Sequence, residues 1–162
     1  MQSAFFAPGG FMQNFNSVSG PRPTDDGTYA ITNIVSPTTR VPLIDAVGDT
    51  GKYVGAILAS PEKYAGKVFS AATALYTYTE VCEIMSKVTG KNVVYKQLPK
   101  EVWGTFMPPG MAPSMVDMFV WVEEYGYFGP GTKEKVEWTV AQARGKLTGL
   151  EEYLRRCLLD LK

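Results

Sequence analysis

The sequence offers few side chains whose types and spacing could carry acid–base or nucleophilic chemistry. It contains no histidine, so neither a Ser-His-Asp triad nor a Cys-His pair can form. Asp25 and Asp26 occur in a polar segment that is typical of solvated turns. Glu123 and Glu124 are neighbours on an expected helix, where adjacent side chains point in different directions. We therefore assign no catalytic residue.

Motifs that hold metals or dinucleotides are also missing from the sequence. The two cysteines, Cys82 and Cys157, are far apart and have no Cys/His partners, so we expect reduced thiols and no metal site. There is no G-x-G-x-x-G loop and no Walker A sequence to bring backbone amides against a pyrophosphate. The Tyr-x-x-x-Lys pair, the proton relay of short-chain dehydrogenases, does not occur at any tyrosine.

Residues 107–128 are rich in methionine and aromatic side chains. Within them, Met115, Phe119 and Trp121 belong to an expected helix that is apolar on nearly every side, and such a helix must be buried all round or line something. Methionine-rich apolar surfaces are common in adaptable binding sites, but simple core packing explains the same pattern. Both interpretations stay open, and we take these three residues as candidate walls of a substrate or partner cleft.

The elements that would position these side chains follow from hydrophobic periodicity and from turn signals. We expect strands at residues 3–7, 29–35, 41–44, 67–71 and 92–98, and helices at residues 11–18, 49–59, 78–89, 100–106, 114–125 and 150–161. This order predicts an α/β protein whose helices are concentrated late in the chain.

Several element ends carry specific signals. Asp49 is expected to be the N-cap of its helix. The T-x-x-E pattern predicts a capping box at Thr77–Glu80 and another at Thr148–Glu151. Pro42 indicates a strand end or an edge strand, because proline cannot donate to a sheet ladder. Residues 133–145 show no clear period, and we interpret them as a short helix or an extended piece.

Bulk properties narrow the function classes. The chain has 162 residues, 45% of them hydrophobic, with 16 basic and 16 acidic side chains and a formal net charge of +0. One domain of this size can bury a core. The absence of a basic excess argues against direct nucleic-acid binding. No apolar run is long enough to span a membrane and no basic signal-peptide region precedes one, so we expect a cytoplasmic, or a nuclear, protein.

Four stretches together resemble the C-terminal half of the NmrA-like family, atypical extended relatives of the short-chain dehydrogenases. They are APGGFMQNF (7–15), VPLIDAVGDTGKYVGAIL (41–58), GKVFSAATALYTYTEVCEIMSKVTGKNVVYKQLP (66–99) and MVDMFVWVEEYGYFGPG (115–131). The resemblance implies the late strands of an NAD(P)-binding Rossmann-like sheet plus a small α+β substrate or partner lobe. Residues 1–60 would be the remnant of the Rossmann sheet and helices, and residues 61–162 the C-terminal small lobe.

The resemblance also implies a binding site. The residues beside the nicotinamide end of a bound NAD(P) would be Pro8, Gly9, Gly10 and Phe11. The residues lining the adjacent substrate or partner cleft would be Met12, Asn14 and Phe15. In the family, the preceding half of the protein carries the glycine loop and most cofactor contacts. We therefore expect NADP or NAD in a full-length relative, and no tight binding by this chain alone.

Three functions follow from these observations. The first is a non-catalytic, redox-sensing regulator of the NmrA-like type that has lost the dinucleotide loop. The second is an NAD(P)H-dependent oxidoreductase of the quinone or isoflavone reductase kind, whose N-terminal half is missing from this chain. The third is an interaction module that binds a protein partner or a second copy through an exposed sheet edge at residues 3–7.

Overall fold

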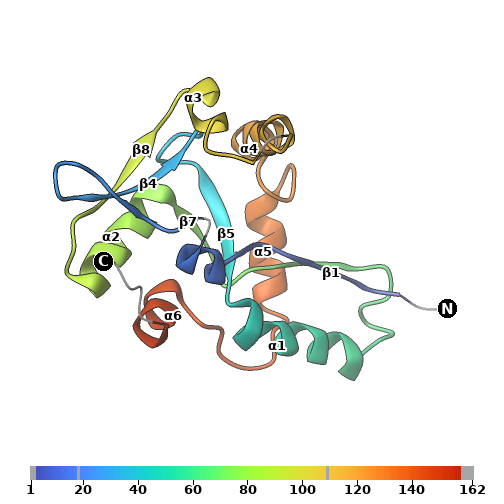
Figure 1. Cartoon of the computed structure of the whole chain (residues 1–162). Coiled ribbons are helices and arrows are strands. Elements are labelled where there is room, and N and C mark those ends of the chain that lie inside the picture. The colour runs from blue at the N-terminus through green and yellow to red at the C-terminus, as the bar shows by residue number, and fades with distance from the viewer. Residues whose placement is uncertain (1–2, 18, 109, 158–162) are drawn as a thin grey trace.

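The computed structural model of the chain describes residues 3–17, 19–108 and 110–157. The strands are β1 (Phe5–Pro8), β2 (Gly10–Phe11), β3 (Arg22–Pro23), β4 (Tyr29–Asn33), β5 (Arg40–Ile44), β6 (Val68–Ala71), β7 (Ala74–Thr77) and β8 (Val93–Gln97). The helices are the 3-10 helix η1 (Met12–Asn16), α1 (Ala46–Ala59), α2 (Tyr78–Thr89), α3 (Lys100–Gly104), α4 (Ala112–Tyr125), α5 (Thr132–Val140) and α6 (Leu150–Arg156). The alternation of strands and helices confirms the predicted α/β class (Figure 1).

The described strands form three small ladders of mixed direction. β1 pairs in parallel with β6; β5 lies between β2 (parallel) and β7 (antiparallel); β4 lies between β3 (antiparallel) and β8 (parallel). Each ladder joins strands that are far apart in the sequence, and three of the pairings cross the expected boundary at residues 60/61. That boundary stays a prediction.

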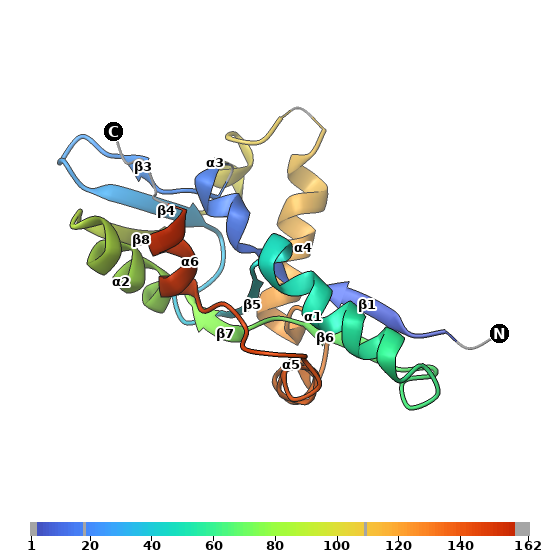
Figure 2. The same cartoon turned by 90° about the horizontal axis from the view of Figure 1, so that it is seen from below.

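Two hydrophobic clusters support these ladders. The smaller cluster lies at the β1–β6 pair, where Phe6 contacts Tyr53 of α1 and Phe69 contacts Trp138 of α5, with ring centroids 6.2 and 5.4 Å apart. α1 and α5 therefore both pack against this pair, as Figure 2 shows. The larger cluster includes Met12 and extends from η1 through α2 and β8 to α4 and α6.

The N-cap of α1 is Asp45, and the prediction of Asp49 is wrong. The Asp45 carboxylate accepts hydrogen bonds from the backbone N–H groups of Val47 and Gly48. Asp45 directly follows β5, so the helix begins as soon as the strand ends. Asp49 instead lies inside the first turns of α1, fully buried, and accepts bonds from groups distant in the sequence.

One of the two predicted capping boxes is confirmed and the other is wrong. Thr77 accepts a bond from the Glu80 N–H, and the Glu80 carboxylate accepts one from the Thr77 N–H. Before α6 the N-cap is Gly149, which has no side chain to form a cap, and the Thr148 hydroxyl donates to Asp49 instead. The part of the predicted last helix at residues 158–161 lies outside the described residues.

The structure also decides three further expectations. Pro42 lies in the middle of β5, which is a central strand; the ladder to β2 begins only at Leu43, after the proline. The short-helix interpretation of residues 133–145 is confirmed, because α5 occupies the first part of this segment. α4 is not buried all round, since Val122 is its only fully buried residue and its outer side is exposed (Figure 1).

Candidate functional site

Residues 8–11 carry the chain from β1, which pairs with β6, to β2, which pairs with β5; we call this segment the turn, and it is held against β5. The Gly9 N–H donates to the Ala71 carbonyl of β6, at 2.9 Å, and Gly10 pairs with Leu43. A Cβ atom on Gly9 would lie 2.7 Å from the Pro42 carbonyl oxygen, closer than real Cβ contacts allow. The close approach of β5 therefore explains the glycine at position 9 without any ligand.

The same turn lies where ligands bind in α/β proteins, at the carboxyl end of a parallel strand. Pro8 is partly buried, whereas the Phe11 side chain is 41% exposed and offers an apolar face. Among the described residues, β1 has β6 as its single partner strand, so its other edge is free. These features fit one wall of a site for a flat ring, and the assignment of Pro8, Gly9, Gly10 and Phe11 to a cofactor stays a prediction.

The structure brings four of the six candidate cleft residues into one hydrophobic cluster. Met12 and Phe15 are buried, and Met115 and Phe119 of α4 pack against the same cluster. Core packing therefore accounts for these four side chains, whether or not a cleft is present.

The other two cleft candidates are elsewhere. Asn14 is exposed on η1. Trp121 is 51% exposed on the outer side of α4 and does not belong to the cluster. The grouping of all six residues in one cleft stays a prediction.

A polar network behind the turn was not predicted from the sequence. Asp45, fully buried, accepts hydrogen bonds from Gln13 Nε2, at 2.7 Å, and from the Arg156 guanidinium, which also lies over the Tyr153 ring. The Gln13 side-chain oxygen in turn accepts the Ala46 N–H, at 3.2 Å. The network ties η1, the start of α1 and the end of α6 to one another.

The electrostatics of this network favour an ionised carboxylate. Burial works to raise the pKa of Asp45, but hydrogen bonds from the Gly48 N–H, Arg156 and Gln13 outweigh it and hold the pKa below its usual range. The ionised Asp45 has no proton to donate and Gln13 does not titrate, so neither is a proton donor for a ligand at the turn.

A second buried carboxylate, Asp49, fixes the segment before α6. It accepts bonds from the Thr148 N–H at 2.9 Å, from the Thr148 hydroxyl at 3.1 Å and from the Thr73 hydroxyl at 3.2 Å, and pairs with Lys52 at 2.7 Å. Its role is structural, since its acceptor capacity is used by the protein itself.

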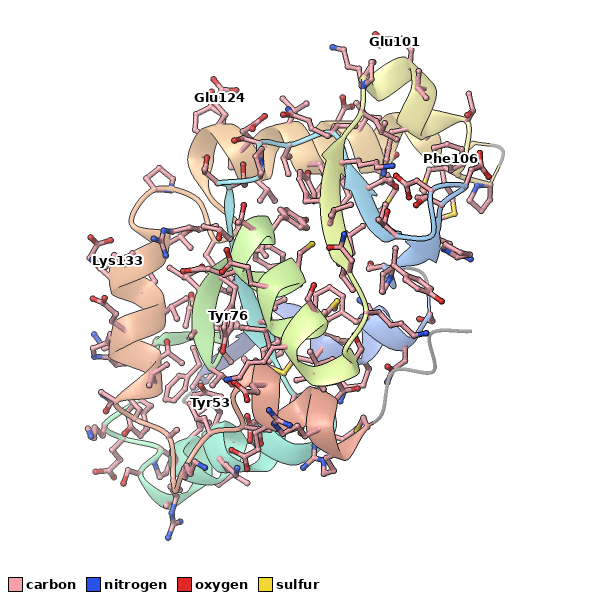
Figure 3. The ribbon with its side chains drawn as sticks, turned by 90° about the vertical axis from the view of Figure 1, so that its left-hand side faces the viewer. Tyr53, Tyr76, Glu101, Phe106, Glu124 and Lys133 are labelled. Carbon is pink, nitrogen blue, oxygen red and sulfur yellow. The ribbon has the colours of Figure 1, made fainter. Side chains whose placement is uncertain are left out.

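Three buried or partly buried tyrosines are poor candidates for proton transfer. Burial raises the pKa of Tyr53, Tyr78 and Tyr95 well above the usual tyrosine range. The hydroxyls of Tyr53 and Tyr95 donate to backbone carbonyls, at 2.8 and 2.6 Å. The Tyr78 hydroxyl accepts a hydrogen bond from the Asn33 side-chain amide. Tyr53 lies between α1 and the strands in Figure 3.

Two open hollows flank Glu123 of α4, with volumes of about 470 and 460 Å³. The first is lined by residues that include Arg40 and Lys133, and the second by residues that include Gln97 and Val120. Neither reaches the turn at residues 8–11. Within the described parts of the chain, no group of acidic, cysteine or histidine side chains could hold a metal ion, and no helix is long and apolar enough to cross a membrane.

Comparison with known families decides where the chain belongs. The model of the NmrA-like family matches residues 1–154. The chain belongs to the NmrA-like family. This agrees with the resemblance of the four sequence stretches, which lie within the matched residues.

Solved structures of the same fold are similar over nearly the whole chain. A doubly substituted mutant of NmrA is 22% identical with a TM-score of 0.77, and 98% of this chain covers 53% of it. NmrA described as a negative transcriptional regulator in complex with NADP is 20% identical with a TM-score of 0.69, at 98% and 53% coverage. An NADPH-dependent quinone oxidoreductase from Escherichia coli is 17% identical with a TM-score of 0.66, at 92% and 52% coverage.

The chain thus spans about half the length of the solved structures that it matches, and it has their NAD(P)-binding Rossmann-like α/β fold over that half. A comparison with curated protein sequences gives no significant match.

Proposed function

We propose that the chain forms the nicotinamide-side wall of an NAD(P) site in a non-catalytic, redox-sensing regulator of the NmrA-like family. The observation that carries this proposal is the position of the turn at residues 8–11. It lies at the carboxyl end of β1 with an exposed phenylalanine and a free strand edge beside it. The relative described as a negative transcriptional regulator in complex with NADP supports the choice of function.

The chemistry at the turn favours a sensor over a reductase. A bound nicotinamide would supply hydride transfer, while Phe11 would cover one ring face and the buried Met12 and Phe15 would exclude water behind it. A reductase also needs a positioned proton donor. Gln13, two residues after the turn, donates to Asp45, which follows the strand residue paired with Phe11, and Asp45 also accepts from Arg156.

A site with one wall would bind a dinucleotide only weakly. The backbone cradle for a pyrophosphate is not found in the sequence, so the chain alone lacks the interactions that give dinucleotides most of their affinity. We propose that tight binding requires a Rossmann half with a glycine loop, joined to this chain or supplied in trans.

Calorimetric titration tests the proposal. NADPH, NADP⁺ and NAD⁺ are titrated into this chain and into a chimera that joins it to the glycine-loop half of an NmrA-like relative. We expect saturable binding only by the chimera, weakened by Phe11→Ala and unaffected by Leu58→Ala, a matched loss of an exposed apolar side chain on α1. Micromolar binding by the chain alone would contradict the one-wall geometry.

A reductase is the second candidate, supported by the fold shared with an NADPH-dependent quinone oxidoreductase. Consumption of NADPH with quinones by the chimera would favour it over the regulator. No consumption despite tight binding is what we expect of a sensor.

An interaction module is the third candidate, supported by the free edge of β1, where Phe5 is 55% exposed and Val68 of β6 is 52% exposed. Size-exclusion chromatography with light scattering separates this case, because a module that pairs through β1 elutes as a dimer or larger species. We place all three functions in the cytoplasm or nucleus, which fractionation of cells expressing a tagged form would test.

A further inference from the structure

The outer side of α4 carries large apolar side chains that the described residues leave uncovered. Met118, Trp121 and Tyr125 are 41%, 51% and 44% exposed. They are three and four residues apart, so they lie on one side of the helix. The rings of Trp121 and Tyr125 pack together, with centroids 4.5 Å apart. Exposed apolar side chains gathered on one side of a helix are typical of interaction sites.

Other side chains of α4 hold the helix in place. Phe119 packs edge-on against Trp103 of α3, with ring centroids 5.4 Å apart, and Val122 is buried. The Glu123 carboxylate accepts the Ser36 N–H at 2.6 Å and the Thr39 hydroxyl at 3.2 Å. The exposed side chains therefore stand on a fixed helix, which lowers the ordering cost of binding.

Acidic side chains border the apolar stripe. Asp117 and Glu124 are four residues before and three residues after Trp121, so both lie beside it, and Glu124 points away from the protein in Figure 3. α4 contains no lysine or arginine. Neither carboxylate makes an ion pair with any residue that the structure describes. We call Asp117, Met118, Trp121, Glu124 and Tyr125 the α4 outer face.

We propose that the α4 outer face docks a basic amphipathic segment of a partner protein. Apolar side chains of the segment would cover Met118, Trp121 and Tyr125, and its lysines or arginines would pair with the two carboxylates or lie over the Trp121 ring. A second copy of the chain fits worse, because pairing of two such faces brings like charges together. The inference goes beyond the NAD(P) site and does not rest on it.

Fluorescence anisotropy with labelled peptides tests the proposal. The probes are a helical leucine–lysine peptide of about 14 residues and its leucine–glutamate counterpart. We expect saturable binding of the basic peptide alone, weakened as NaCl rises from about 0.05 to 0.5 M. Because the chain has no net charge, general electrostatic attraction gives no such preference.

Variants locate the binding. Trp121→Ala should weaken binding about tenfold or more, as expected for an aromatic anchor, while Leu58→Ala on α1 should not. Asp117→Asn with Glu124→Gln should weaken binding and flatten its salt dependence. The matched control, Glu134→Gln with Glu137→Gln on α5, removes the same charge elsewhere and should do neither.

Three results would overturn the proposal. The first is that the acidic peptide binds as tightly as the basic one, or that the basic peptide does not bind. The second is that the control pair on α5 weakens binding as much as the Asp117 and Glu124 substitutions do. The third is that the unliganded chain self-associates and that Trp121→Ala abolishes this self-association. Thermal melts followed by circular dichroism confirm that each variant is folded.

Discussion

Replacing Gly9 by alanine tests the packing of the turn that borders the proposed site. A Cβ atom at this position would lie 2.7 Å from the Pro42 carbonyl oxygen, 3.0 Å from its Cβ and 3.1 Å from its carbonyl carbon. These atoms belong to the central strand β5 and cannot rotate away, so the turn and the strand must separate. Overpacking of this kind costs about 1–3 kcal/mol. We expect Gly9→Ala to lower the free energy of unfolding by that amount.

Urea unfolding followed by tryptophan fluorescence measures the effect, which corresponds to a midpoint shift on the order of 1 M. The matched control is Gly51→Ala on α1, where an added Cβ meets nothing within 4 Å. Alanine should stabilise this helix by about 0.5–1 kcal/mol. A Gly9→Ala variant as stable as the wild type would refute the close approach of β5 and would leave the glycine to be explained by a ligand.

Further predictions concern the buried groups. Thr148→Val removes a hydroxyl that donates to the buried Asp49 and should cost about 1–3 kcal/mol in urea unfolding, whereas Thr148→Ser should retain most of the stability. Burial raises the pKa of Cys82 to about 12. With a thiol reagent at about pH 8, only the more exposed Cys157 should therefore react quickly. A fast phase of thiol modification that survives in Cys157→Ser would contradict this. The lowered pKa of Asp45 adds stability at neutral pH, and this stability is lost as the pH falls through the folded-state pKa. The difference in free energy of unfolding between the wild type and Asp45→Asn, measured by urea unfolding, should therefore shrink below about pH 4. A difference that stays constant with pH would show that the pKa of Asp45 is unperturbed.

Features decided within a few residues were predictable from the sequence. The capping box at Thr77–Glu80 is present, and Gly90 ends the same helix in the left-handed conformation. The α/β class followed from periodicity, and the family from the four stretches. These signals succeed because their partners are neighbours along the chain, so geometry allows few alternatives.

Choices between equivalent local signals were decided by the tertiary structure. Asp45 and Asp49 are both suitable N-caps, and Thr148 is a suitable cap for α6. The fold buries Asp49 against Thr148, 99 residues away, so each is unavailable to its own helix end. A buried carboxylate must be hydrogen-bonded, and that requirement overrides a local preference worth about 1 kcal/mol.

The candidate site shows the same distinction between what the sequence determines and what the tertiary structure decides. The sequence by itself determined the residue types: a Pro-Gly-Gly-Phe turn, no histidine, no glycine loop and an apolar helix at 114–125. Only the tertiary structure decided that β5 rather than a ligand requires Gly9, that Asp45 is held between Gln13 and Arg156, and that Trp121 points outward. The reason is physical: burial and pairing depend on which distant segments meet, and a linear pattern of residue types does not specify that.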